Sequence, residues 1–452
     1  MSSALLRKIT AVVVGLMAAT SSAQVRDDGS SADVGTLQGA LSHELSSLTL
    51  PDGWKFSVQG HARTMQETYR GVDFGLSEIK DDAWVHQRVQ VMMRAEYEST
   101  FGLAMELTWG RMWDKKGPLA PPDEDEPDFL QLYTQWRPEV GHGDKLLFRA
   151  GRQTLYYGSG RLLAAREGAN QRLSHDAFLI SYANSRGAQV DAFIASPVQI
   201  THGAFDNRSH PDEVLFWSVY AVLPSPLGPE DFVDLYYIGL RDEDSIFVDS
   251  GGREVRHTIG TRWWSEAEPL IYNTELILQF GRAGERDILA GAASLGVGYV
   301  FREAPWKPTL MMRADLISGG DAEGDLHTFH PLFQANNYFN EGGFVSPSNL
   351  WNINPVVIVR PHPKVEVSMG VNFLWRFSAE DDVYGPPLQR LAGPAPGGER
   401  YLGTAFNAAV TWKATASTEV FLGFTHHEAG ASLTEVGGGN EDYFQASVRF
   451  EF

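Results

Sequence analysis

Apolar and polar residues alternate with a period of two in many short stretches of this 452-residue chain. In the closing stretch 442–452, every second position is apolar, namely Phe444, Ala446, Val448, Phe450 and Phe452. Successive side chains of a β-strand point to opposite faces, so this stretch has one apolar and one polar face. A tilted strand needs roughly ten residues to cross a bilayer. The pattern is typical of a membrane strand, although an edge strand of a soluble sandwich would share it.

The same alternation predicts a series of strands along the chain. Together with 442–452 they number about eighteen, an even number as in bacterial barrels; the others are 54–65, 84–97, 101–112, 129–137, 145–153, 174–182, 188–196, 214–222, 232–240, 256–264, 272–282, 288–301, 308–317, 351–360, 364–377, 403–413 and 418–427. The predicted fold is therefore all-β, a transmembrane antiparallel up-and-down β-barrel of about 18 strands.

The connections between these strands alternate between short and long. The short ones are 98–100, 138–144, 183–187, 223–231, 265–271, 302–307, 361–363 and 414–417. The long ones are 66–83, 113–128, 154–173, 197–213, 241–255, 318–350, 378–402 and 428–441, and only 283–287 breaks the order. Short periplasmic turns and longer outer loops give this alternation in an outer-membrane barrel, whereas a sandwich gives no reason for it.

Closure of such a barrel makes a specific prediction about its two end strands. If the chain starts in the periplasm, Phe452 lies at the periplasmic rim. The strand 442–452 must then pair with 54–65, which brings Lys55, His61 and Arg63 near Arg449 and Glu451.

Composition narrows the alternatives. After residue 23 no apolar run approaches twenty residues, so no membrane-spanning helix is predicted. The formal net charge of −20 argues against a nucleic-acid partner, because phosphates require a basic surface. The chain has no cysteine, which excludes disulfides, thiolate metal sites and a cysteine nucleophile.

The N-terminal residues predict export. Arg7 and Lys8 precede a short apolar core and the small residues of 21–23, so 1–23 is predicted to be a signal peptide. Residues 24–53 are predicted to be a periplasmic N-terminal arm. Apolar residues within 34–50 lie close to helical spacing, which fits either a short helix or an unstructured arm. Residues 54–452 form the predicted barrel.

The segment 145–186 is rich in arginine in an otherwise acidic chain. It holds Lys145, Arg149, Arg152, Arg161, Arg166, Arg172 and Arg186 against only Glu167 and Asp176. Guanidinium groups lining a pore would favour anions and bind carboxylates. The alternative is that they pair with acidic lumen residues such as Glu96, Glu106, Asp191 and Asp315 and hold the wall together.

Two further groups of residues suggest other chemistry, namely metal binding and catalysis. The acidic runs 123–128 and 380–382 lie in predicted outer loops, where carboxylates suit Ca²⁺, although such runs are more often solvated charge. No other cofactor is expected. Ser174, His175 and Asp176 are adjacent on a predicted strand, so their side chains diverge and cannot form a catalytic triad. We therefore expect no enzyme.

Two sequence motifs carry a resemblance to a known family. The segment 151–162, GRQTLYYGSGRL, and its continuation 166–172, REGANQR, resemble a signature of the alginate export family of outer-membrane proteins. The segment 328–333, TFHPLF, followed by 337–339, NYF, resembles that family's later loop, which contains PLF. The resemblance runs over most of 50–452.

The resemblance implies an eighteen-stranded barrel that exports a polyanionic uronate polymer through an arginine-lined constriction. Carried onto this chain, the constriction would hold Arg152, Arg161, Arg166 and Arg172, with Arg149 and Arg94 as neighbours. The expected surroundings and partners are the polysaccharide, outer-membrane lipid and lipopolysaccharide, the barrel assembly machinery and periplasmic export components. A general or small-anion porin, or a plugged structural or enzymatic barrel, remains the alternative.

Overall fold

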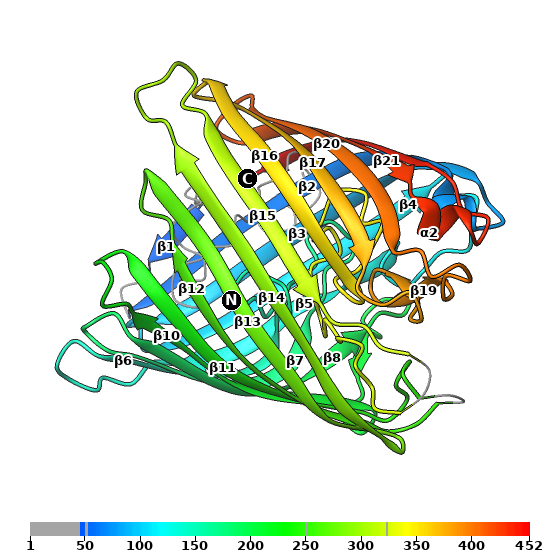
Figure 1. Ribbon diagram of the computed structural model, residues 1–452. Helices are drawn as coiled ribbons and strands as arrows, with labels where there is room; N and C mark the ends of the chain where they lie inside the picture. The colour runs from blue at the N-terminus through cyan, green and yellow to red at the C-terminus, as the bar shows by residue number, and fades with distance from the viewer. Residues whose placement is uncertain (1–45, 50–52, 249–250, 322–323) are drawn as a thin grey trace.

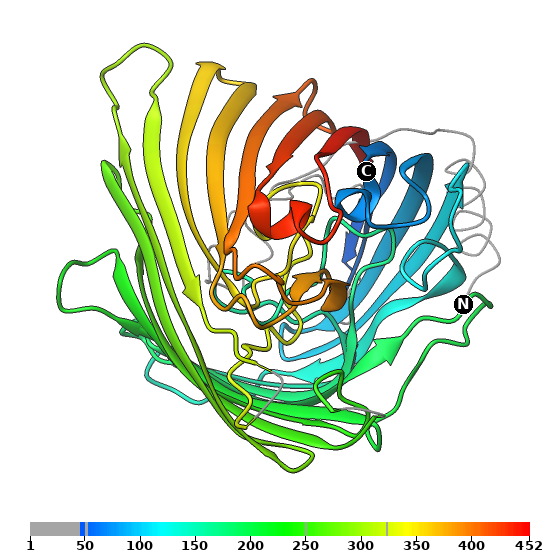
Figure 2. The ribbon, with the colours of Figure 1, turned by 45° about the vertical axis from the view of Figure 1, so that its right-hand side comes forward.

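The computed structural model describes residues 46–49, 53–248, 251–321 and 324–452. Its wall is a closed antiparallel β-barrel of 18 strands, with the inside partly filled by loops (Figure 1, Figure 2). The predicted fold class is confirmed. The signal peptide and most of the N-terminal arm lie outside the described residues.

Every predicted strand has a counterpart in the wall. The wall strands are β2 (Trp54–Arg70), β3 (Asp81–Tyr97), β4 (Phe101–Trp113), β5 (Asp125–Trp136), β6 (Lys145–Gln153), β7 (His175–Ala183), β8 (Gln189–Gln199), β10 (Val214–Pro224), β11 (Asp231–Asp242), β12 (Glu254–Ser265), β13 (Leu270–Ala283), β14 (Arg286–Val300), β15 (Thr309–Ile317), β16 (Leu350–His362), β17 (Val365–Arg376), β20 (Tyr401–Lys413), β21 (Thr418–Ala429) and β22 (Glu441–Glu451). Smaller elements are β1 (Ser46–Thr49), β9 (Arg208–Ser209), β18 (Val383–Gly385), β19 (Gln389–Ala392), the 3-10 helix η1 (Val72–Gly75) and the helix α2 (Ala431–Thr434).

The barrel closes between β2 and β22. Their antiparallel register pairs His61 with Glu451 and Arg63 with Arg449. The predicted pairing of the first and last wall strands is therefore confirmed. Lys55 lies beyond the end of β22, where it pairs with Thr49 of β1, so its predicted place near Arg449 is wrong.

The described part of the N-terminal arm is extended. Residues Ser46–Thr49 form β1, which pairs with β2 below the end of β22. The short helix that the spacing within 34–50 allows therefore does not include Ser46–Thr49. None of the described helices is long and apolar enough to cross a membrane.

Connections at one end of the barrel are short turns, and those at the other end are longer loops (Figure 1). The exception predicted at 283–287 is a tight hairpin between β13 and β14. Gly284 takes a φ of 56° there, a left-handed conformation that favours glycine. We call the two rims the short-turn end and the long-loop end.

The two faces of the wall differ as the alternation predicts. Large apolar side chains such as Leu103, Phe373 and Phe424 are exposed on the outer face. Polar side chains such as Gln279 and Asn372 are buried on the inner face. An apolar band outside and a polar interior are what a barrel in lipid requires, and they exclude the sandwich.

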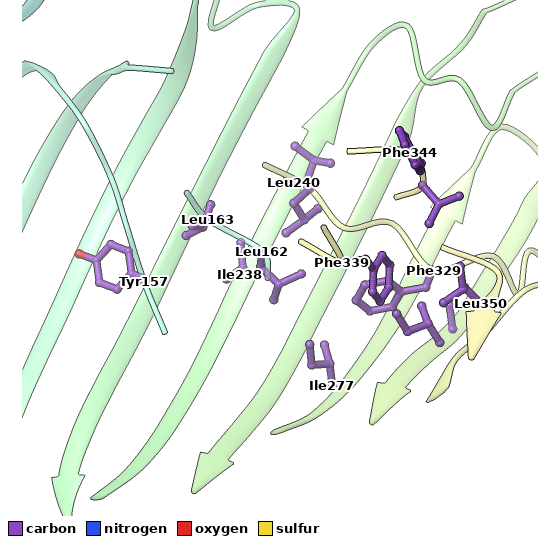
Figure 3. Close-up of a cluster of buried hydrophobic side chains, with 14 of the residues drawn as sticks. Tyr157, Leu162, Leu163, Ile238, Leu240, Ile277, Phe329, Phe339, Phe344 and Leu350 are labelled. Carbon is purple, nitrogen blue, oxygen red and sulfur yellow. The ribbon is translucent and has the colours of Figure 1, made fainter. Parts of the chain in front are cut away.

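An apolar core lies inside the barrel, where the wall meets two loops. The loops are 154–174 and 318–349, hereafter inner loop A and inner loop B (Figure 2). Leu162 and Leu163 of inner loop A pack in the same buried cluster as Phe329 and Phe339 of inner loop B (Figure 3). Wall residues such as Ile277 complete this cluster, so both loops are fixed against the inner face of the wall.

The closing register can be tested by cross-linking, because the chain has no native cysteine. Residues opposite each other on antiparallel strands have Cβ atoms about 4.5–5.5 Å apart, close to disulfide range. We expect the double variant His61→Cys/Glu451→Cys to cross-link on oxidation, as read by mass spectrometry of the linked peptides. The shifted pair His61→Cys/Arg449→Cys is the control, and preferential cross-linking of that pair would contradict the register.

Candidate functional site

The two inner loops are joined to each other inside the barrel. Phe333 donates from its backbone N–H to the carbonyl of Leu162 at 2.8 Å, and its own carbonyl accepts from Ala164 at 2.9 Å. A further hydrogen bond joins Ala335 to Gly160 at 3.0 Å. The two motifs that the sequence singled out, 151–162 and 328–333, therefore meet in one short parallel ladder.

Three arginines lie side by side on the inner face of the barrel wall. The register places Arg63 of β2 between Arg449 of β22 and Arg88 of β3. We call Arg449, Arg63 and Arg88 the arginine row. All three are buried, and like charges in adjacent positions of a sheet repel one another. The row therefore needs compensation from elsewhere in the chain.

Inner loop A supplies that compensation. Arg63 donates to the carbonyl oxygens of Glu167 at 2.9 Å, Gly168 at 3.2 Å and Ala169 at 3.0 Å. Arg88 donates to two of the same carbonyls, those of Glu167 and Ala169, at 3.2 and 3.0 Å. Its Nη2 also pairs with the carboxylate of Glu167. Buried guanidinium groups are tolerated when they are hydrogen-bonded in this way.

A glycine lets inner loop A come this close to the wall. Gly110 of β4 lies opposite Arg88 in the register. A Cβ atom at this position would lie 2.3 Å from Nε2 of Gln171 and 2.8 Å from Nδ2 of Asn170. Both distances are shorter than real contacts allow, so a larger residue here would displace the amide groups of Gln171 and Asn170.

The row was missed as a site by sequence reasoning. The period-two alternation puts Arg63 and Arg88 on the polar faces of their strands, but no motif connects them to 166–172. Only the pairing of β2 with β3 and β22 shows that the three arginines share one row. The signal available in the sequence was an arginine at matching positions of strands expected to be neighbours.

Three of the six predicted site arginines are neutralised by carboxylates. Arg161 lies 2.5 Å from Glu275 and 3.9 Å from Asp315, and it also donates to the Tyr338 hydroxyl. Asp315 is one of the acidic lumen residues that the sequence offered as an alternative partner for these arginines.

The other two paired arginines lie at different places. Arg152 at the end of β6 lies 3.0 Å from Asp176 and 3.5 Å from Asp128. Arg172 lies 2.8 Å from Glu167. The ion pairs of Arg152 and Arg161 match the alternative in which arginines pair with acidic lumen residues, whereas the pair of Arg172 lies within inner loop A.

The remaining three predicted arginines make no ion pair with any described carboxylate. Arg166 of inner loop A donates to the carbonyl of Gln334 at 3.2 Å, and burial lowers the pKa of its guanidinium to about 10. Arg149 donates to Gln135 and stacks over the ring of Tyr133. Arg94 of β3 is half-buried on the inner face. Arg166 remains charged at neutral pH, so it contributes an uncompensated positive charge.

The wall half-way round the barrel from the arginine row carries carboxylates instead. Four of them accept a hydrogen bond from a tyrosine hydroxyl; the pairs are Tyr157–Asp191 at 2.8 Å, Tyr220–Asp234 at 2.6 Å, Tyr236–Glu275 at 2.7 Å and Tyr338–Asp315 at 2.7 Å. We call β22, β2 and β3 the basic side and β8 to β15 the acidic side, although the acidic side also holds the buried Arg256 and Arg262, which pair with Glu254 and Asp234. Inner loops A and B lie between them.

The acidic outer runs make protein contacts. Asp123 pairs with Lys115 at 2.5 Å, and Asp125 accepts from Asn207 at 2.7 Å. Within the ranges that the structure describes, no group of three or more His, Asp or Glu side chains is arranged to hold a metal ion. Calcium binding in these loops stays a prediction.

The contacts of Arg63 predict its contribution to stability. Arg63→Met keeps an unbranched apolar side chain but removes three hydrogen bonds to loop carbonyls; Arg88 still donates to two of these, and the carbonyl of Gly168 loses its described side-chain donor. We expect a loss of about 2–4 kcal/mol in the free energy of unfolding, measured by urea unfolding in lipid vesicles. The control is Arg302→Met, whose partner Glu268 is exposed, and we expect less than about 1 kcal/mol there. Equal losses in the two variants would contradict the anchoring role.

The environment of Glu167 predicts how the loop responds to pH. Burial favours the neutral form, but Arg172 and Arg88 prevail and hold the pKa of Glu167 well below its ordinary value. A carboxyl with a lowered pKa stabilises the fold above its unfolded pKa of about 4.3, and this is lost only as the pH falls through the folded value. We expect hydrogen-exchange protection of 154–174 to stay constant from about pH 8 to about pH 5. A loss of protection within that window would contradict the assignment.

Comparisons with known proteins agree with this architecture. The chain resembles the crystal structure of Pseudomonas aeruginosa OpdO with a TM-score of 0.59 and 11% identity, covering 88% of this chain and 97% of that one. It resembles Pseudomonas aeruginosa OccK2 (OpdF) in complex with glucuronate at 0.58 and 10%, covering 88% and 98%. The outer membrane protein OpdK of the same organism gives 0.57 and 10%, covering 87% and 98%. At these identities the likeness shows the fold alone.

A comparison with curated proteins found no match. The family model described as alginate export matches residues 55–447, which is most of the chain. Together with the closed barrel this identifies a porin-like channel of the bacterial outer membrane and a transport protein rather than an enzyme. The chain belongs to the alginate export family.

Proposed function

We propose that this protein is a passive, anion-selective channel that exports alginate or a similar anionic uronate polysaccharide. The polymer would enter at the short-turn end, which faces the periplasm, and leave at the long-loop end. Between them it would pass the arginines of inner loop A and the neighbouring wall. The observation that carries the proposal is Arg166, a lumenal guanidinium without a carboxylate partner among the described residues, in a member of the alginate export family.

The chemistry of the polymer fits such a passage. Each uronate unit carries one carboxylate, and guanidinium groups bind carboxylates with charge-assisted hydrogen bonds. Arg166, Arg149 and Arg94 carry charges that no described ion pair neutralises, so they would attract these carboxylates into the lumen. Conduction also requires that binding at each point be weak enough for release. Several separate arginines meet this requirement better than one tight site.

The paired arginines have a different role in this proposal. Arg161 and Arg152 are fixed by Glu275 and Asp176, so they would shape inner loop A rather than attract the polymer. Arg172 shares its charge with Glu167. The selectivity assigned from the resemblance to six arginines would thus fall mainly on three of them.

A small-anion porin is the second candidate. OccK2 (OpdF), whose fold resembles that of this chain, was solved in complex with glucuronate, which is a monomeric uronate. The inner loops also occupy much of the barrel interior (Figure 2). In a fully plugged barrel these loops would stop conduction altogether.

The surroundings of the barrel belong to the same proposal. The exposed apolar outer face would contact outer-membrane lipid and lipopolysaccharide. The closing strand β22 and Phe452 would be recognised by the barrel assembly machinery, and periplasmic export components would deliver the polymer to the short-turn end.

The proposal is tested by single-channel recording of the purified barrel in planar bilayers. We expect anion-selective reversal potentials in a salt gradient and a block of the current by polyuronate. Arg166→Gln should lower the anion-to-cation permeability ratio at least about twofold and weaken the block, because an uncompensated lumenal charge is removed. The control Arg302→Gln, on an exposed turn at the short-turn end, should leave both unchanged.

Other outcomes separate the candidates. Anion selectivity with no response to polyuronate would favour the small-anion porin. The absence of any conductance would favour a plugged barrel, and cation selectivity would contradict both channel proposals.

A further inference from the structure

Glu167 has an unusual position for a carboxylate in this barrel. It lies on inner loop A beside the arginine row, between Arg88 of the wall and Arg172 of its own loop. Arg449 and His61 also lie near enough to interact with it electrostatically. Glu167 therefore lies between a guanidinium group of the wall and one of its own loop, whereas the carboxylates of the acidic side also accept a hydrogen bond from a tyrosine hydroxyl.

The contacts of Glu167 are those of a bound carboxylate ligand. Its Oε1 accepts from Nη2 of Arg88, and its Oε2 lies 2.8 Å from Nε of Arg172. One guanidinium on each oxygen is a strong arrangement for binding a carboxylate. The Nε atoms of Arg63 and Arg88 are buried and have no hydrogen-bond partner among the described residues. The site thus has donors beyond those that Glu167 uses.

The carboxylate end of this site is partly exposed, whereas its base is buried. The Glu167 side chain is 26% exposed and that of Arg172 is 20% exposed, whereas that of Arg88 is 0% exposed. Arg172 is therefore the more accessible of the two guanidinium groups, and Arg88 lies at the base of the site.

The Glu167 side chain is not the sole contact that holds the loop against the arginine row. Arg63 holds the backbone carbonyls of Glu167, Gly168 and Ala169, and Arg88 holds two of them. The side chain can leave the two guanidinium groups while these five backbone contacts persist. Departure of the carboxylate is thus separable from unfolding of the loop.

We propose that Arg88 and Arg172 form a carboxylate subsite whose resident ligand is the chain's own Glu167, and that uronate carboxylates of the passing polymer exchange with it. This inference rests on the proposed function and adds a specific subsite to it. The exchange replaces one carboxylate by another, so the charge on the site is unchanged. Competition from Glu167 keeps the affinity for each uronate low, which suits a polymer that must move on.

A simple structural counter-ion would give the same static picture but different binding behaviour. If Glu167 only neutralises the arginines, its removal leaves uncompensated charge and lowers stability without creating a site for a soluble uronate. If Glu167 is a competing ligand, its removal leaves the subsite free.

The test uses glucuronate as a soluble probe of chloride current through the full barrel in planar bilayers. Glu167→Gln keeps the size of the side chain and its loop contacts but cannot offer a carboxylate. We expect the inhibition constant for glucuronate to fall about tenfold relative to the unaltered protein, the effect of losing one competing charge-assisted contact. The matched control is Glu366→Gln, which removes another lumenal carboxylate, the partner of Arg360, and should change the constant less than about twofold.

The outcomes distinguish this inference from the proposed function. An unchanged glucuronate constant in Glu167→Gln, with anion selectivity intact in the unaltered protein, overturns the subsite and leaves the proposed function standing. Loss of anion selectivity and of polyuronate block in the unaltered protein overturns the proposed function itself.

A second variant covers the case in which Glu167→Gln fails to assemble, as judged by the heat-modifiable migration of a folded barrel. Arg172→Gln removes one of the two guanidinium groups of the subsite. We expect the glucuronate constant to rise at least about fivefold. A constant equal to that of the unaltered protein overturns the subsite.

Discussion

A sheet inside a bilayer has to close on itself, because an unpaired strand edge would leave backbone N–H and C=O groups without partners in hydrocarbon. In this chain that requirement is met by the pairing of β2 with β22. The register of this seam also decides the chemistry of the lumen. It places Arg63 between Arg449 and Arg88, and so concentrates positive charge on one side of the barrel.

The rest of the interior follows from that concentration. A buried row of like charges needs carbonyl and carboxylate oxygens, and inner loop A provides both at 167–169. Once anchored there, the loop reaches across to inner loop B through the contact of Leu162 with Phe333. Arg161 then reaches Glu275 on the acidic side. The seam, the two loops and the acidic wall therefore form one connected arrangement.

Much of the fold could be predicted from local patterns. Strands in a barrel wall show period-two alternation wherever one face is apolar and the other polar. This alternation located every wall strand, including β13 and β14 on either side of the short connection 283–287. The N-terminal arm was less accessible, because helical spacing of apolar residues in 34–50 does not decide the structure of an arm. Its described residues form β1, which pairs with the part of β2 that extends beyond the shorter strand β22.

The candidate site was predicted less completely, because charge balance depends on register and on distant residues. The loop motif identified Arg152, Arg161, Arg166 and Arg172, yet the partners of Arg161 come from β13 and β15, more than a hundred residues away. Local sequence cannot indicate which arginine meets such a partner. Arg63 and Arg88 belong to no motif and come together only through strand pairing.

The division between paired and unpaired arginines bears on how a polyanion could move through such a lumen. Arginines fixed by carboxylates give the inner loops a definite shape at little cost in net charge, whereas unpaired ones create a field that draws anions inward. A lumen with only the second kind would hold a polyanion tightly at many points and slow its release. Carboxylates on the opposite wall, and Glu167 within the arginine row, weaken that hold. The balance of both signs across the lumen is therefore better suited to transit than a uniformly basic channel would be.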